Sequence, residues 1–221
     1  MGGFKNQSFN SNFRDGLFSI IVVALEKSCE LMVNNHINNG TTIENHEEKI
    51  RTHLLENFLD KDELRSDIGL EDCYLRFSVE ASENYDPSTN TYVGRTDIKV
   101  VSKNWFDDRN DYFIIECKRI DGTRTLNNKY ITEGVSRFVG SHPKYSSYHN
   151  KNFMLGFIVK GIDFKNNLSD ISKIHIRELS HNIRSDIFLK TSSSLFYYCE
   201  SEYNNDLLLA HIFYDFSSII A

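Results

Sequence analysis

The sequence predicts a single α/β domain in which a mixed β-sheet is flanked by helices on both faces. Helical and strand-like segments alternate along the chain, and the strands expected near residues 112–120 and 153–159 are strongly apolar, as strands inside a covered sheet are. The 221 residues are 40% hydrophobic, which is enough for one substantial core. No Gly-, Ser- or Pro-rich linker divides them, so we expect one domain over residues 1–221.

Two helices are expected at the start of the chain. The first extends from Ser11 to just before Gly40, because apolar residues recur there at three- and four-residue steps. The second begins at Thr41 or Thr42 and continues to about residue 60. Its apolar stripe contains Glu47, a carboxylate that needs a partner or a metal ion in such a place.

Three strands follow these helices. They are expected at residues 73–80, at about 91–101 and at 112–120, and the turn-forming residues 84–90 form a loop between the first two. Because only the polar connection 103–111 separates the second strand from the third, the two are predicted to form an antiparallel hairpin.

The second half of the chain returns to helical spacing after Thr125. The apolar strand at 153–159 comes next, and a strand, a helix and a buried strand in that order predict a parallel crossover. A polar segment at 166–180 is expected to be helical, and residues 194–199 and 207–216 are expected to be two further strands. The predicted core order is therefore helix, three strands, helix, strand.

Charge, cysteine content and the length of the apolar runs indicate which partners and which cellular setting to expect. The net charge of −6 argues against indiscriminate binding to nucleic acid, but residues 116–165 carry nine basic and four acidic side chains. That asymmetry suits a protein with one face for a polyanion. The four cysteines form no C-x-x-C pair, which favours a reducing, cytoplasmic setting. The apolar run 16–25 is about half the length of a membrane span, so no membrane partner is expected.

A [D/E]-x-K triplet occurs four times, beginning at Glu47, Asp97, Glu116 and Asp163. Such a triplet is weak evidence alone. The third triplet lies in a strongly apolar strand, where strand periodicity places Glu116 and Lys118 on one face. Since placing charged side chains at the end of a buried strand costs desolvation free energy, a functional site explains them better than a structural role.

The antiparallel pairing would bring Asp97 next to Glu116. Two carboxylates that close repel each other unless a cation lies between them, and oxygen ligands favour Mg²⁺ or Mn²⁺. A surface ion pair on an edge strand remains the plain alternative. A second register is also open, in which Asp97 and Lys99 form the motif and Glu80 is the upstream acid.

An Asp on one strand, an E-x-K on the next and an acidic residue on a preceding helix resemble the PD-(D/E)XK, or restriction-endonuclease-like, nuclease superfamily. The likeness covers about residues 41–160, and Thr96 stands where the motif names a Pro. The segment 130–139 followed by the Gly156 strand is similar to bacterial members, some of them in phage defence. The resemblance implies a restriction-endonuclease-like fold with an αβββαβ core, here followed by extra C-terminal strands.

The resemblance also implies roles for particular residues. Asp97, Glu116 and the carbonyl of Cys117 would hold the metal ion, and Lys118 would orient or deprotonate the attacking water or stabilise the phosphorane. The helix acid would be Glu47, with Glu44 and Glu48 as alternatives. Tyr130 and Arg137 are candidates for a phosphate contact, although Glu133 lies one helical turn before Arg137 and offers it an ordinary ion pair.

The expected function is therefore a cytoplasmic, Mg²⁺- or Mn²⁺-dependent endonuclease that hydrolyses phosphodiester bonds in DNA rather than RNA, in a role such as restriction or phage defence. Sequence specificity would require a homodimer or a partner protein. The alternative is a catalytically inactive nuclease-fold module that binds a protein, an immunity-type role that suits the acidic net charge.

Overall fold

The computed structural model describes residues 7–79, 82–102, 112–140 and 143–221. Its centre is a seven-stranded sheet in the order β1-β4-β5-β6-β9-β8-β7. The strands are β1 (Leu75–Val79), β4 (Ile98–Ser102), β5 (Tyr112–Ile120), β6 (Lys151–Ile158), β7 (Ile183–Ser192), β8 (Phe196–Tyr203) and β9 (Leu208–Asp215). Strands β5, β6 and β9 run parallel and the other neighbours antiparallel. The predicted α/β class with a mixed sheet is confirmed.

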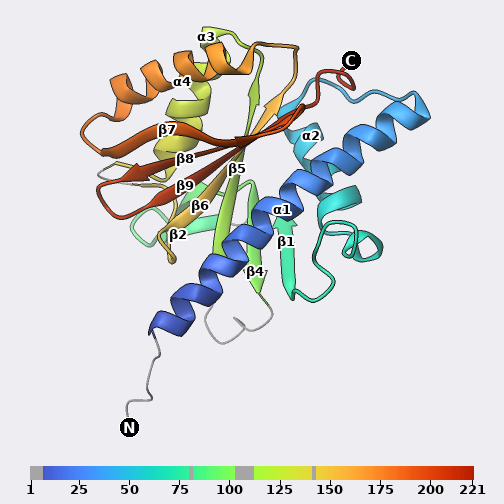
Figure 1. Cartoon of the computed structure of the whole chain (residues 1–221). Helices are drawn as coiled ribbons and strands as arrows, with labels where there is room; N and C mark the ends of the chain where they lie inside the picture. The colour runs from blue at the N-terminus through green and yellow to red at the C-terminus, as the bar shows by residue number, and fades with distance from the viewer. Residues whose placement is uncertain (1–6, 80–81, 103–111, 141–142) are drawn as a thin grey trace.

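Helices cover both faces of this sheet. They are α1 (Gln7–Asn39), α2 (Glu47–Leu54), the π-helical turn η1 (Leu55–Leu59) and the 3₁₀ turn η2 (Asp62–Leu64), then α3 (Arg124–Lys129), the π-helical turn η4 (Tyr130–Gly134), the 3₁₀ turn η5 (Val135–Arg137) and α4 (Phe164–Leu179). Phe113 and Ile115 of β5 pack in one core with α1 and α2, whereas Ile114 packs in a second core with η4 and α4. Figure 1 shows α1 running across the sheet.

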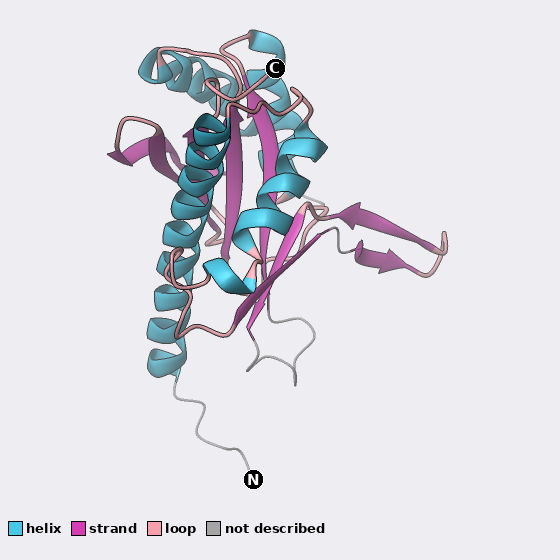
Figure 2. Cartoon of the chain, turned by 90° about the vertical axis from the view of Figure 1, so that its right-hand side faces the viewer, coloured by secondary structure: helices cyan, strands magenta, loops and turns pink. Residues whose placement is uncertain are grey.

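Strands β2 (Ser82–Asp86) and β3 (Thr91–Arg95) form a separate two-stranded hairpin. Figure 2 shows this hairpin projecting away from the main sheet. The prediction of one continuous strand over 91–101 is therefore wrong, because the chain leaves the hairpin at Thr96 and enters the main sheet at Ile98. The loop predicted at 84–90 is also too long, since the turn is confined to 87–90.

The second helix begins later than predicted. It starts at Glu47 with His46 as its N-cap residue, and neither Thr41 nor Thr42 caps it. The cause is a pairing with the end of the chain: the Ile43 N–H donates to the carbonyl of Ile219, and the Ile43 carbonyl accepts from Ala221. This contact holds Ile43 in a β-bridge with Ile220 and so keeps it out of the helix.

The C-terminal half agrees with the predicted helix and with two of its strands. Helix α4 begins where the Asp163 carboxylate accepts a hydrogen bond from the Asn166 N–H. The sequence did not indicate β7, an edge strand whose pairing with β8 contains register shifts that break its alternation. Nor did it predict that β9 would insert beside β6, parallel to it.

Across the described ranges, none of the helices combines the length and the apolar character that crossing a membrane demands.

Candidate active site at the end of strand β5

The second half of β5 extends beyond its neighbour β4. Their ladder ends at the pair Ile98 and Ile115, and carboxylates then accept the backbone hydrogen bonds on that side. The Cys117 N–H donates to Asp97 Oδ2 at 2.7 Å, and the Arg119 N–H donates to Glu47 Oε2 at 3.0 Å. Two acidic side chains thus take the place of a strand along this edge.

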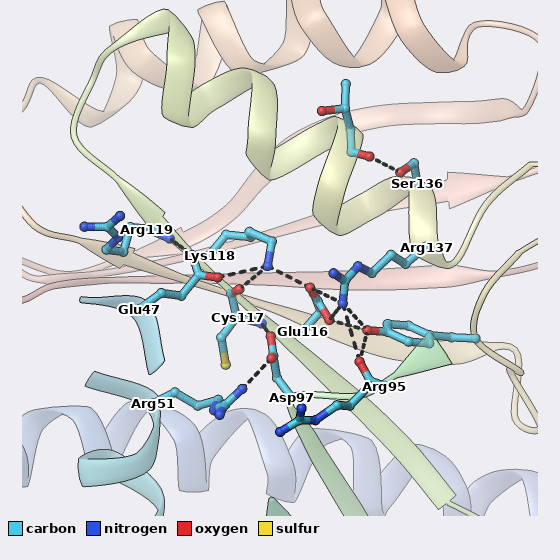
Figure 3. A network of polar contacts seen from close by, with 12 residues as sticks. Glu47, Arg51, Arg95, Asp97, Glu116, Cys117, Lys118, Arg119, Ser136 and Arg137 are labelled. Carbon is cyan, nitrogen blue, oxygen red and sulfur yellow. Dashed lines mark hydrogen bonds and ion pairs between the residues drawn. The ribbon is translucent and has the colours of Figure 1, made fainter. Parts of the chain in front are cut away.

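The side chain of Lys118 lies in the middle of these acidic groups. Its Nζ donates to Glu116 Oε1 at 2.8 Å, to Glu47 Oε1 at 3.1 Å and to the carbonyl of Cys117 at 2.8 Å. Figure 3 shows these contacts as one network that also includes Asp97. The structure therefore brings together the four residues that the sequence predicts as catalytic.

Of the three glutamates considered on the preceding segment, Glu47 is the one that reaches the site. Glu44 and Glu48 are exposed, and Glu44 pairs with Lys49 at the surface. Glu47 is the first residue of α2, which places its carboxylate over the end of β5.

Glu116 is fully buried, with 0% of its surface exposed. Arg137 Nη1 lies 3.0 Å from its Oε1, and the hydroxyl of Tyr145 donates to its Oε2 at 2.7 Å. Burial, followed by the nearby negative charge of Asp97, raises the pKa of Glu116 to about 7, although Lys118 and Arg137 act in the opposite direction. The Asp97 carboxylate is therefore close enough to oppose the ionisation of Glu116, as expected of two carboxylates that share a site.

Lys118 stays charged in this environment. Burial alone would lower its pKa, but the carboxylates of Glu116 and Glu47 outweigh burial and raise the pKa above its ordinary value. An ammonium held in this way cannot accept a proton from water near neutral pH. Of the roles expected for Lys118, hydrogen-bond donation and charge stabilisation fit the geometry, and general-base catalysis does not.

Two residues of the site were not singled out by the sequence. Arg51 Nη1 contacts Asp97 Oδ1 at 2.6 Å, and its side chain is almost buried. Arg51 follows Glu47 by four residues and so lies on the same helical face, and this spacing could have indicated it as a site residue. Tyr145 is buried, and its hydroxyl donates to Glu116.

The structure contradicts the phosphate-binding role expected for Tyr130. This side chain has 0% of its surface exposed, and its hydroxyl lies 2.9 Å from His211 Nδ1 inside the second core. Helix α3 gives way to the π-helical turn η4 at this residue, which changes the helical spacing on which the prediction relied. Arg137 does reach the site, but it pairs with Glu116 rather than with Glu133.

The alternative motif beginning at Asp97 is less well supported. Lys99 Nζ lies 3.5 Å from the ring centroid of Tyr112, and Glu80 lies outside the described residues. Lys118, in contrast, contacts two described carboxylates. The contacts favour the triplet on β5.

The donor atoms of the site suit a hard divalent cation. Asp97, Glu116 and the Cys117 carbonyl offer only oxygen, and Mg²⁺ commonly binds through one or two carboxylates plus water and substrate phosphate. Within the described part of the chain, no group of three or more His, Cys, Asp or Glu side chains is arranged to hold a metal ion. The two carboxylates are already contacted by Arg51, Lys118 and Arg137, so an ion would have to compete with these cations.

A cavity of about 350 Å³ adjoins the network, between α2, the end of β5 and α3. Lys118 and Glu47 line it, so the cluster can be reached from this side.

No protein-family model, curated protein or solved structure matches this chain.

Proposed function

We propose that this chain is a metal-dependent nuclease of the restriction-endonuclease-like type, which hydrolyses phosphodiester bonds in DNA. The observation that carries the proposal is the ammonium of Lys118 surrounded by oxygens of Glu47, Glu116 and Cys117 at the end of an otherwise apolar strand. Taking such a group of charges out of water costs several kcal/mol per ion, on the order of what the ion pairs return. A catalytic role would explain why the protein contains this buried group of charges.

Asp97, Glu116 and the carbonyl of Cys117 would hold Mg²⁺ or Mn²⁺. When bound, the ion acidifies a water molecule and neutralises charge that develops on the phosphate. Lys118 donates hydrogen bonds to the same developing charge, because its ammonium is kept protonated. Glu47 positions Lys118 from α2, and Arg51 fixes the carboxylate of Asp97.

Cleavage of plasmid DNA in the presence of Mg²⁺ or Mn²⁺ tests the proposal. Glu116→Gln keeps the size of the side chain but removes its charge, and we expect the cleavage rate to fall by about 10²-fold or more. Glu178→Gln, an exposed change on α4, is the matched control and should cleave like the wild type. Circular dichroism verifies that both variants fold. Equal cleavage by Glu116→Gln and the wild type would falsify the assignment.

A second candidate is a catalytically inactive module of the same fold that binds a protein. The observation in its favour is that Arg51, Lys118 and Arg137 already form ion pairs with the two carboxylates. In that case calorimetry with Mn²⁺ should show no binding, and Glu116→Gln should leave the calorimetric trace unchanged. Saturable Mn²⁺ binding that Glu116→Gln abolishes would instead support the nuclease.

A further inference from the structure

The cavity beside the carboxylate network has several cationic side chains on its walls. Arg51 and Lys118 line it, and both are held by carboxylates. Arg119 and Lys129 line it as well, and their hydrogen-bonding capacity is less fully used. These two residues belong to the stretch 116–165, whose local charge is positive.

The guanidinium of Arg119 is oriented but not saturated. Its Nη1 donates to the carbonyl and the side-chain oxygen of Asn45, at 2.7 and 2.8 Å. Its Nε is buried without a partner, and its Nη2 makes no hydrogen bond to any residue that the structure describes. Figure 3 shows this guanidinium directed away from Glu116 and its partners. The Nη2 of Arg119 is therefore the donor that a ligand in the cavity could use, because no described residue accepts from it.

Lys129 is the last residue of α3, and its side chain is exposed. Four residues later comes Glu133, the usual spacing of a helical ion pair. The π-helical turn η4 intervenes and changes that spacing, and no ion pair joins the two side chains in the described structure. The ammonium of Lys129 is therefore available to an anion at the cavity.

We propose that Arg119 and Lys129 bind a backbone phosphate of the substrate strand in this cavity, next to the group that Lys118 forms with Glu47 and Glu116. This inference rests on the proposed nuclease function, and it states from which side the substrate strand reaches the site. A guanidinium fork and an ammonium are the side chains that best recognise phosphate. The Arg137 side is less suitable, because Arg137 is already engaged by Glu116 and Tyr145.

The size and the charge of the cavity limit what it accepts. About 350 Å³ lies at the small end of ligand pockets, which span about 300–1,000 Å³, so the cavity takes a nucleotide-sized part of one strand rather than a whole duplex. Two exposed carboxylates, Glu48 and Glu133, line the same cavity and repel a phosphate. Removing one of them should therefore have the opposite effect to removing Lys129.

The test is the binding of a fluorescent single-stranded oligodeoxynucleotide, measured by anisotropy in EDTA so that no hydrolysis occurs, between 50 and 200 mM salt. Lys129→Ala should weaken binding about 3- to 10-fold. It should also reduce the magnitude of the slope of log affinity against log salt by about 0.7, the value for one phosphate contact with a single strand. Glu133→Gln should tighten binding. Lys173→Ala, an exposed lysine on α4, should behave like the wild type.

Three results would overturn the phosphate site: no measurable binding by the wild type, equal binding by Lys129→Ala and the wild type, or an equal loss in Lys173→Ala. The proposed phosphate site and the proposed nuclease activity can be rejected independently. If Lys129→Ala and Glu133→Gln shift binding in opposite directions but no metal ion supports cleavage, the phosphate site is supported and the nuclease activity is rejected. If the wild type cleaves DNA and Lys129→Ala has an unchanged KM, the nuclease activity is supported and the phosphate site is rejected.

Discussion

Two buried polar networks lie on the same side of the sheet and differ in charge. One surrounds Lys118 at the end of β5. The other extends from η4 across β9 and β8 to α4. Its successive hydrogen bonds join Tyr130 to His211 (2.9 Å), His211 to Ser201 (2.7 Å), Ser201 to Tyr203 (3.0 Å), Tyr203 to His175 (2.9 Å) and His175 to Asp186 (2.5 Å).

The difference shows how burial acts on His211, which no described carboxylate contacts directly, and on Lys118, which carboxylates surround. Burial lowers the pKa of His211 to about 3, so this imidazole stays neutral and its hydrogen bonds satisfy it. Lys118 is kept charged against burial by carboxylates that are also desolvated. The neutral hydrogen bonds of His211 are adequate for stability. The network of Lys118 instead retains charges beside a cavity, which is an arrangement suited to catalysis.

The largest expected effect comes from removing the charge of Lys118. Lys118→Met should lower the cleavage rate about 10²- to 10³-fold. It should also destabilise the fold by about 3 kcal/mol, the lower end for a broken buried pair, because Arg137 still contacts Glu116. Urea denaturation and plasmid cleavage measure the two effects.

The double variant Glu116→Gln/Lys118→Met sharpens the contrast. Replacing both charged partners should restore most of the lost stability but none of the cleavage, since a buried pair contributes little net stability. A double variant no more stable than Lys118→Met would show that the network of Lys118 is mainly structural.

His211 in the second network should lower stability in acid. The pKa of His211 is lower in the folded state than its ordinary value of 6.5, so the unfolded state binds the proton first. Stability should fall as pH decreases from about 6.5 toward 3, by about 1.4 kcal/mol per pH unit from this group. Thermal denaturation across that range should show a shallower slope for His211→Gln. An unchanged slope would mean that other groups control acid unfolding.

The smallest effect is expected at the end of the second network. Tyr130→Phe removes the hydroxyl that contacts His211 Nδ1 and leaves that buried nitrogen without this partner. We expect a loss of about 1–3 kcal/mol in the free energy of unfolding, with cleavage unchanged because Tyr130 is buried away from the cavity. A fall in cleavage at full stability would instead place Tyr130 in the site.

Local patterns in the sequence predicted much of the first network. The apolar strand around Glu116 and Lys118 was located to the residue, because strand periodicity is strong there. The antiparallel pairing of β4 with β5 followed from a short connection. Glu47 was singled out because it interrupts an apolar helical stripe, and it does contact Lys118, although its helix starts at Glu47 itself.

Features that depend on distant contacts were not predictable in this way. The break at Thr96 and Asp97 reflects the pairing of β3 with β2. The late start of the second helix reflects the contact of Ile43 with Ile219. The π-helical turn that buries Tyr130 has no sequence signal in a single chain. Tyr145 reaches Glu116 from a loop 29 residues away, and no spacing rule connects them.

The edge of β5 beyond Ile115 has a consequence for solubility. Strand edges with free N–H groups recruit strands from other molecules and start aggregation. Along this edge Asp97 and Glu47 accept the N–H groups of Cys117 and Arg119, so a foreign strand finds those positions occupied. Truncating either acidic side chain would open part of the edge, and the protein would then lose protection against self-association together with a member of its candidate site.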